Sequence, residues 1–238
     1  MASLPADLTG LRLIHLSDLH LTGRWYAAHE ALLARIAQAD ADLICFTGDL
    51  VENRWNPRPA LNNARRFMEH LRSRLGTFAI LGNHDGDLLA PYLARWNCHL
   101  LHPGVAELRW KGAKVEIIGL CCVARTDLRD RWIRSIPPRR PDGLRIVLSH
   151  FPDHIHRLAA LQPDLVLAGH THGGQVCLPG GRAVLTHDSL PTSMAAGIYS
   201  ICGTRLVISR GVGFATFPIR LFSPPEVCEL TLTPPTGG

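Results

Sequence analysis

Residue types that bind metal ions recur in five short blocks along the chain, and each block follows a short apolar run. The blocks are Asp18-Leu19-His20, Gly48-Asp49, Gly82-Asn83-His84-Asp85, Ser149-His150 and Gly169-His170-Thr171-His172. The apolar runs predict buried strands, and the carboxyl ends of neighbouring parallel strands meet at one edge of a sheet. Carboxylate, amide and imidazole ligands without any thiolate suit Mn, Fe, Zn or similar divalent ions. We therefore expect these blocks to converge on a site with enough ligands for two metal ions.

Two ions that share a carboxylate can clamp a phosphoryl group and activate a water molecule for in-line attack. Asp49 is the expected shared carboxylate, because Gly48 before it lets the backbone approach closely. The candidate metal ligands are Asp18, His20, Asp49, Asn83, His150, His170 and His172. His84 is the candidate catalytic group, which would stabilise the phosphoryl oxygen and protonate the leaving group. Asp85 beside it is expected to orient the imidazole.

The elements that must position these residues follow from the hydrophobic pattern. Strands are expected at 11–17, 43–47 and 78–81, alternating with helices at 25–39, 60–75 and 87–96, which implies a largely parallel sheet. A hairpin at 105–110 and 114–120, helices at 126–136 and 152–161, and strands at 144–148 and 165–168 follow. The last third is predicted to be rich in strands, at 175–178, 183–185, 197–201, 205–209 and 226–232. We expect an α/β fold in which two mixed β-sheets pack as a sandwich flanked by helices, with residues 1–238 forming a single domain.

The composition limits the class of protein. The chain has 238 residues, of which 46% are hydrophobic, so a sizeable core can form, and its net charge of +5 favours an anionic substrate or surface. Seven cysteines without a CxxC motif predict reduced thiols. No apolar run is long enough for a membrane span, so we expect a cytoplasmic protein and leave a peripheral contact with the inner membrane open. The sequence has no P-loop and no recognisable nucleic-acid-binding module.

The five blocks in this order resemble the signatures of the calcineurin-like metallophosphoesterase superfamily, from residue 13 to about residue 175. The resemblance implies one metal ion held by Asp18, His20, Asp49 and His172, and a second held by Asp49, Asn83, His150 and His170. Segments 169–175, 209–213, 218–220 and 224–226 further resemble the bacterial YaeI/YkuE branch, which includes the UDP-2,3-diacylglucosamine pyrophosphatases. The implied reaction is hydrolysis of a phosphodiester or pyrophosphate, with UDP-2,3-diacylglucosamine, cleaved to UMP and a lipid monophosphate, as one candidate substrate. Mn is the first expected metal, with Fe, Zn and Mg as alternatives.

Several alternatives stay open at this point. The chain could instead be a broad phosphodiesterase of small nucleotides, or a scaffold of the same fold without activity. Segment 121–142 could be a solvated helix face, or a lid whose arginines grip a diphosphate; these are Arg125, Arg129, Arg131, Arg134, Arg139 and Arg140. Trp25 and Trp55 could line the pocket or simply pack. The oligomeric state does not follow from the sequence.

Overall fold

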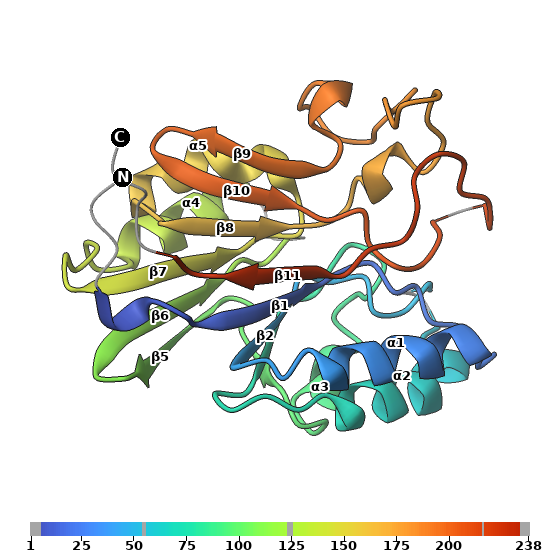
Figure 1. Ribbon diagram of the computed structural model, residues 1–238, viewed down its shortest axis with the longest axis horizontal. Coiled ribbons are helices and arrows are strands. Elements are labelled where there is room, and N and C mark those ends of the chain that lie inside the picture. Colours follow the sequence, from blue (N-terminus) through green and yellow to red (C-terminus); the bar gives the residue numbers. More distant parts are fainter. Residues whose placement is uncertain (1–5, 54–55, 123–125, 216, 234–238) are drawn as a thin grey trace.

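Two β-sheets stacked face to face, with helices against both outer faces, form the molecule (Figure 1). The computed structural model describes residues 6–53, 56–122, 126–215 and 217–233. The amino- and carboxyl-terminal ends of this described part lie near each other, because β11 returns beside β1 (Figure 1).

The first sheet contains five strands in the order β11-β1-β2-β3-β4. These strands are β1 (Arg12–Leu16), β2 (Leu43–Phe46), β3 (Thr77–Ala79), β4 (His99–Leu100) and β11 (Cys228–Thr231). Strands β1 to β4 are parallel, and β11 pairs with β1 in the antiparallel direction. The parallel connections are made by helices α1 (Ala27–Gln38), α2 (Arg58–His70) and α3 (Ala90–Leu93). These three helices lie together on one face of the sheet (Figure 1).

The second sheet contains six strands in the order β5-β6-β7-β8-β10-β9. They are β5 (Gly104–Trp110), β6 (Ala113–Gly119), β7 (Gly143–Leu148), β8 (Leu165–Ala168), β9 (Gly197–Ile201) and β10 (Thr204–Ile208). The four inner strands are parallel, and the edge strands β5 and β9 are antiparallel to their neighbours. Helices α4 (Thr126–Ser135) and α5 (Ile155–Leu158) belong to this half. Short 3₁₀ turns complete the fold at Ala6–Leu8, Pro152–His154, Ala159–Leu161, His172–Gly174 and Thr192–Met194.

Alternate residues of the central strands enter different hydrophobic layers, because successive side chains of a strand point to opposite faces. In β1, Leu13 packs into the layer between the two sheets, whereas Ile14 packs toward Phe67 of α2. In β7, Ile146 joins the layer between the sheets, and Val147 joins the layer that contains the α5 residues. The predicted helix-flanked sandwich of two mixed sheets is confirmed.

Several of the predicted elements are wrong in extent or type. The helix expected at 60–75 spans Arg58–His70 and ends where Leu71 becomes extended, with ψ of 130°. The helix expected at 152–161 is divided into a 3₁₀ turn, a four-residue α-helix and a second 3₁₀ turn. Segments 175–178 and 183–185 form only isolated bridges, because Gln175 and the glycines around them hold positive φ angles that a regular strand does not allow.

Candidate metal centre

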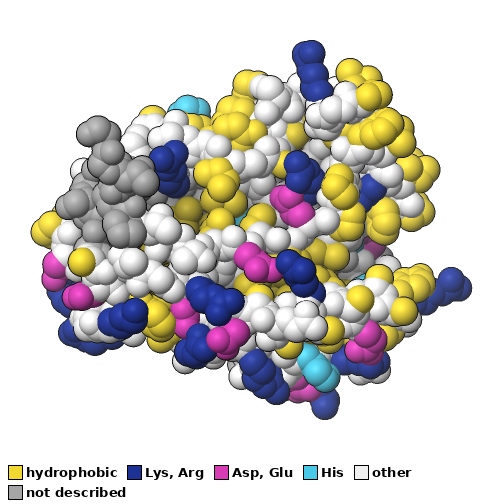
Figure 2. Space-filling view, in the orientation of Figure 1, with side chains coloured by type: hydrophobic (Ala, Val, Ile, Leu, Met, Phe, Trp, Pro, Cys, Tyr) yellow, Lys and Arg dark blue, Asp and Glu magenta, His cyan; other side chains and the backbone are white. Residues whose placement is uncertain are grey.

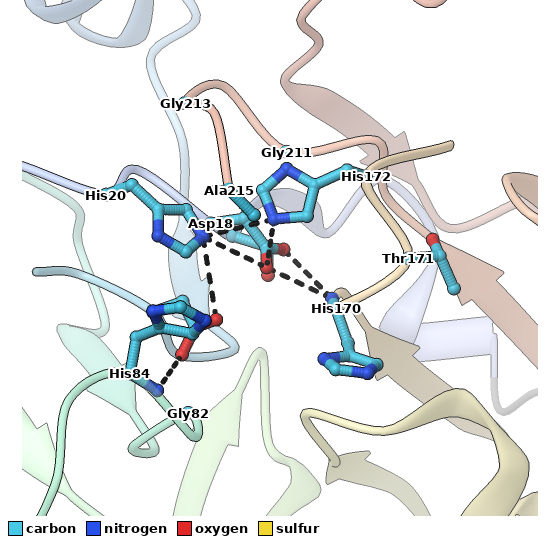
Figure 3. A network of polar contacts seen from close by, with 12 residues as sticks. Asp18, His20, Gly82, His84, His170, Thr171, His172, Gly211, Gly213 and Ala215 are labelled. Atoms are coloured by element: carbon cyan, nitrogen blue, oxygen red, sulfur yellow. Dashed lines mark hydrogen bonds and ion pairs between the residues drawn. The ribbon is translucent and has the colours of Figure 1, made fainter. Parts of the chain in front are cut away.

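The predicted ligands come together at the edge where the parallel strands of both sheets end. The residues that directly follow β1, β2, β3, β7 and β8 supply them all. Two groups have ligand atoms within 4.8 Å of one another: Asp18, His20 and His172, and Asp18, Asp49 and His150. Figure 3 shows Asp18, His20 and His172 facing one another. The sandwich thus joins residues that lie up to 154 positions apart, counted from Asp18 to His172.

The other two predicted ligands lie beside these groups. Asn83 Oδ1 lies 2.9 Å from Nε2 of His150. The imidazole of His170 has its ring centre 5.1 Å from that of His150, and its backbone N–H donates to the carboxylate of Asp18. All seven predicted ligands therefore belong to one cluster, with His170 at its border.

Five of these seven residues hold a left-handed backbone conformation. Their φ angles are 53° at Asp18, 48° at His20, 57° at Asp49, 69° at His170 and 52° at His172. Such angles are uncommon for residues other than glycine and are strained, so they persist where the surroundings fix them, typically at functional sites. Each block therefore turns sharply as it leaves its strand, which directs its side chain into the cluster.

Two glycines of the blocks are required by close approaches of the backbone. A Cβ atom at Gly82 would lie 2.1 Å from Oδ1 of Asp49. A Cβ atom at Gly169 would lie 1.9 Å from Oγ of Ser17 and 2.3 Å from Oδ2 of Asp18. Real Cβ atoms do not approach this closely, so any side chain at either position would push a carboxylate out of the cluster.

Hydrogen bonds on the outer side of three imidazoles determine which nitrogen faces the cluster. His150 Nδ1 lies 2.8 Å from the carbonyl oxygen of Thr47, and His170 Nε2 lies 3.1 Å from that of His187. A carbonyl only accepts, so these nitrogens carry the proton and donate it. His20 Nδ1 likewise donates to Oε2 of Glu52 at 2.5 Å. The other nitrogens, Nε2 of His20 and His150 and Nδ1 of His170, are therefore the ones that would bind a metal ion, in their deprotonated form.

The carboxylates of the cluster are fully buried and remain charged. Burial alone would raise the pKa of Asp18 and of Asp49, but the neighbouring imidazoles lower both below their ordinary value. Burial would lower the pKa of His150, yet the charge of Asp49 raises it to about 9. Burial lowers the pKa of His172 to about 4, so this imidazole is neutral and can act as a ligand.

Asp85 does not orient His84, which corrects the sequence-based expectation. Its buried carboxylate accepts four backbone N–H bonds, from Asp49, Leu50, Val51 and Gly82, at 2.7 to 3.0 Å. Asp85 therefore ties together the two loops that follow β2 and β3. The imidazole of His84 is instead held by Glu52, whose carbonyl oxygen lies 3.0 Å from Nδ1.

Two further residues that hold the cluster were not predicted from the sequence. Glu52 contacts the imidazoles of both His20 and His84, and these three form a further group of potential ligands. Its signal was its position three residues after Asp49, just beyond the block. Arg220 donates to the carbonyl oxygen of His172 at 3.2 Å and to that of Gly213 at 2.6 Å. No spacing links Arg220 to the five blocks.

The lid interpretation of segment 121–142 is not supported where the structure describes it. Ile133 of α4 is buried in the layer on the outer face of the second sheet, so α4 is part of the fold. Arg139 pairs with Asp164 and bonds the carbonyl oxygen of Gly143, at the start of β7, whereas the metal-ligand block follows the end of β7. Trp25 packs under the guanidinium of Arg66. Arg125 and Trp55 lie outside the described residues.

The donor set fits divalent cations. Asp18 and Asp49 are at most 1% exposed, and within the described residues their only ion-pair partners are histidines. Buried carboxylates need a compensating charge, and imidazoles that act as metal ligands are neutral and do not supply one. Asp49 Oδ2 lies 3.5 Å from Nε2 of His20 and 3.3 Å from Nε2 of His150, between the two sets of predicted ligands.

Comparison with known proteins identifies the family of the chain. The UDP-2,3-diacylglucosamine pyrophosphatase LpxG of Chlamydia muridarum is 27% identical over 289 residues, which cover 94% of this chain and 84% of LpxG. A bovine (Bos taurus) transmembrane protein with a metallophosphoesterase domain is 26% identical; 96% of this chain matches, but the chain spans only 54% of that protein. The structure of Haemophilus influenzae NAD nucleotidase superposes with a TM-score of 0.53 at 14% identity, over 94% of this chain and 49% of that one. The family model for calcineurin-like phosphoesterases matches residues 11–174. The chain therefore belongs to the calcineurin-like phosphoesterase family.

Proposed function

We propose that this chain is a binuclear metal-dependent phosphoesterase that hydrolyses a phosphodiester or pyrophosphate bond. The observation that carries the proposal is the position of the Asp49 carboxylate between His20, which follows a strand of the first sheet, and His150, which follows a strand of the second. A carboxylate oxygen with an imidazole on either side can serve as a shared ligand of two neighbouring cations. The family of the chain is one of metal-dependent phosphoesterases, which supports the same reaction class.

One metal ion would be held by Asp18, His20, Asp49 and His172, and the other by Asp49, Asn83, His150 and His170. Mn is our first choice, and Fe, Zn or Mg would also suit these oxygen and nitrogen ligands. When bound, two such ions polarise the phosphoryl oxygens and lower the pKa of a water molecule. The protein's own residues then have to bind the substrate, orient it and supply the proton for the leaving group.

His84 is our candidate for the proton donor. Its Nδ1–H is engaged with the carbonyl oxygen of Glu52, so Nε2 is the nitrogen that can exchange a proton with the substrate. Its side chain is 30% exposed, whereas the side chains of His20 and His150 are at most 1% exposed. His84 therefore lies where a substrate can reach it. A positioned general acid contributes about a hundred- to ten-thousand-fold in rate.

For the substrate we propose a nucleotide-lipid, UDP-2,3-diacylglucosamine, which would be cleaved to UMP and a lipid monophosphate. The likeness to LpxG supports this choice. A surface cavity of about 450 Å³ is lined by Asn56, Pro57, Arg58, Leu88 and Tyr92, which follow Glu52 and Asp85 closely in the sequence. A cavity lined by both an aromatic residue and an arginine suits a nucleotide base and its phosphates. In the described part of the chain, no helix is long and apolar enough to cross a membrane.

A broad phosphodiesterase of small nucleotides is the second candidate, because the same cavity would accept a nucleotide without a lipid. The non-catalytic scaffold is disfavoured by the presence of a complete ligand set together with His84.

The test is a metal-rescue assay on chelator-stripped protein. It compares bis-(p-nitrophenyl) phosphate with UDP-2,3-diacylglucosamine, each with Mn, Mg and Zn. We expect turnover of both, with a far higher kcat/KM for the nucleotide-lipid. Tyr92→Ala in α3 should raise KM for the nucleotide-lipid only, while the matched variant Tyr26→Ala, at an exposed tyrosine that precedes α1, should leave KM for both substrates unchanged. Turnover of the small diester alone would refute the lipid assignment, and no turnover with any metal would refute the phosphoesterase proposal.

A further inference from the structure

Large hydrophobic side chains are exposed in two segments that leave the metal centre. Of fifteen exposed large hydrophobic residues in the described chain, nine belong to segments 176–185 and 214–222. They are Val176, Leu178, Val184, Leu185, Phe214, Phe217, Ile219, Leu221 and Phe222, and Phe217 is 68% exposed. We call these nine residues the apolar rim. Figure 2 shows hydrophobic side chains gathered at the end of the molecule where these loops lie. Monomeric proteins rarely expose contiguous apolar patches of this kind unless they bind something there.

The two segments form one preformed surface. Val176 and Leu221 pair in a parallel bridge, and the backbone N–H of Leu221 donates to the carbonyl oxygen of Gln175 at 2.9 Å. The side-chain amide of Gln175 bonds the carbonyl oxygens of Ala215 and Phe217 at 3.1 and 2.8 Å. These bonds fix the backbone of both segments, with the hydrophobic side chains exposed. The surface therefore does not have to fold when it binds a partner.

The charged residues of the two segments that carry the apolar rim all have one sign. Segments 176–185 and 214–222 contain Arg182 and Arg220 and no Asp or Glu. Within the described residues, neither arginine forms an ion pair with a carboxylate, and the guanidinium of Arg220 bonds backbone carbonyls instead. Arg182 is exposed, whereas Arg220 is half-buried and lies near the charges of Asp18 and Glu226. An apolar surface with an exposed, unpaired positive charge at Arg182 is complementary to a layer of hydrocarbon covered by anionic headgroups.

A second copy of the chain fits this surface less well. Pairing of two copies about a two-fold axis would bring the same patch together with itself, so that the positive charges would face one another without any carboxylate between them. The charge pattern therefore favours a lipid surface over self-association.

The apolar rim is directly joined to the metal centre. Gly213, just before Phe214, donates its N–H to the carbonyl oxygen of Asp18 at 2.7 Å. Figure 3 places Gly213 and Ala215 beside Asp18 and His172. Binding of the apolar rim to a surface would therefore bring the mouth of the site to the same surface.

We infer that the apolar rim docks the protein onto a bilayer with anionic headgroups, so that the metal centre meets phosphoesters at the membrane surface. Docking itself does not depend on hydrolysis, and it can be measured without any substrate. Each large side chain that moves from water into hydrocarbon contributes about tenfold or more to the affinity.

The experiment is co-sedimentation of the full, metal-loaded chain with vesicles of phosphatidylethanolamine and phosphatidylglycerol, and with vesicles of phosphatidylcholine alone. We expect binding to the anionic vesicles, and weaker binding to the neutral ones. The double variant Phe217→Ser/Ile219→Ser should bind at least about tenfold more weakly. The matched variant Ile198→Ser, at a residue 62% exposed on β9, should bind like the wild type. Arg182→Glu should weaken binding to the anionic vesicles only.

Thermal melts and turnover of bis-(p-nitrophenyl) phosphate should be the same for all of these variants, because the substituted side chains lie outside the metal centre. Absence of wild-type binding to either kind of vesicle would overturn the inference. A dimer in sedimentation velocity that the double variant dissociates, without vesicle binding, would also overturn it and would assign the apolar rim to self-association. Neither result would contradict the proposed phosphoesterase activity, which the metal-rescue assay tests separately.

Discussion

The substitution Asp85→Asn tests whether Asp85 orients His84, as expected from the sequence, or holds together the loops that follow β2 and β3, as the structure indicates. Asp85 Oδ1 accepts from the backbone N–H groups of Leu50 and Val51, and Oδ2 accepts from those of Asp49 and Gly82. An asparagine replaces one oxygen by an NH₂ group, which faces two donors and cannot accept from either. Two buried N–H groups then lose their partner at about 1–3 kcal/mol each, so the free energy of unfolding should fall by about 2–6 kcal/mol.

The assay is urea unfolding followed by tryptophan fluorescence at about pH 8. Burial and the charge of Asp49 raise the pKa of Asp85 to about 6, so the carboxylate is ionised at that pH. Metal affinity, measured by calorimetry, should fall as well, because Asp85 holds the loops that carry Asp49 and Asn83. The matched control is Asp130→Asn, which breaks a surface ion pair with Arg157 and should cost less than about 1 kcal/mol. Unchanged stability with a large loss of kcat would refute this reasoning and restore Asp85 as the partner of His84.

Three further predictions follow from the same geometry. Glu52→Gln weakens the acceptor of the His20 Nδ1–H bond, so calorimetry should show about ten- to a hundredfold weaker metal binding. His84→Ala should lower kcat for bis-(p-nitrophenyl) phosphate by about a hundred- to ten-thousand-fold, while calorimetry shows metal affinity changed far less. His15 is buried in β1, where burial lowers its pKa to about 4 from the ordinary 6.5, so the unfolded chain binds a proton that the folded chain does not. In chelator-stripped protein, this residue should therefore lower the free energy of unfolding by up to about 3 kcal/mol as the pH falls from 6.5 to 4. Urea unfolding of His15→Asn should lack that part of the pH dependence.

Each of these three predictions has a control or a result that would contradict it. Glu69→Gln, at a surface glutamate paired with Arg65, should leave metal affinity unchanged, and equal affinities of Glu52→Gln and wild type would contradict the role of Glu52. His156→Ala, at an exposed histidine, should leave kcat unchanged, and unchanged kcat in His84→Ala would exclude it as the proton donor. For His15, a wild-type and variant stability difference that stays constant from pH 6.5 to 4 would contradict the proposed linkage.

The position of the metal-ligand blocks could be predicted from the sequence because it depends on one general property of parallel sheets. Apolar runs such as Leu43–Phe46 indicate buried strands, and polar residues directly after them must lie at the shared edge. The order of strands and helices in the first half could be predicted for the same reason. The contributions of both sheets to one cluster then follow from the sandwich.

What the sequence did not reveal depends on contacts between distant parts of the chain. The direction of the Asp85 side chain is set by the backbone of residues 49–51, which its neighbours in the sequence do not show. The role of Arg220 depends on the return of its loop to His172, 48 positions away. Segment 175–185 has apolar residues that predict strands, but the positive φ angles at Gln175 and at Gly180 turn it into the exposed loop that carries part of the apolar rim.

The most direct test of the central claim is a metal titration of the chelator-stripped chain in which bound Mn and turnover of bis-(p-nitrophenyl) phosphate are measured on the same samples. The account predicts that turnover appears only as a second ion binds, and that Asp49→Asn, which weakens the carboxylate between His20 and His150, loses both the second ion and the turnover. Full turnover with one bound ion, or turnover that survives complete removal of metal, would contradict a binuclear centre.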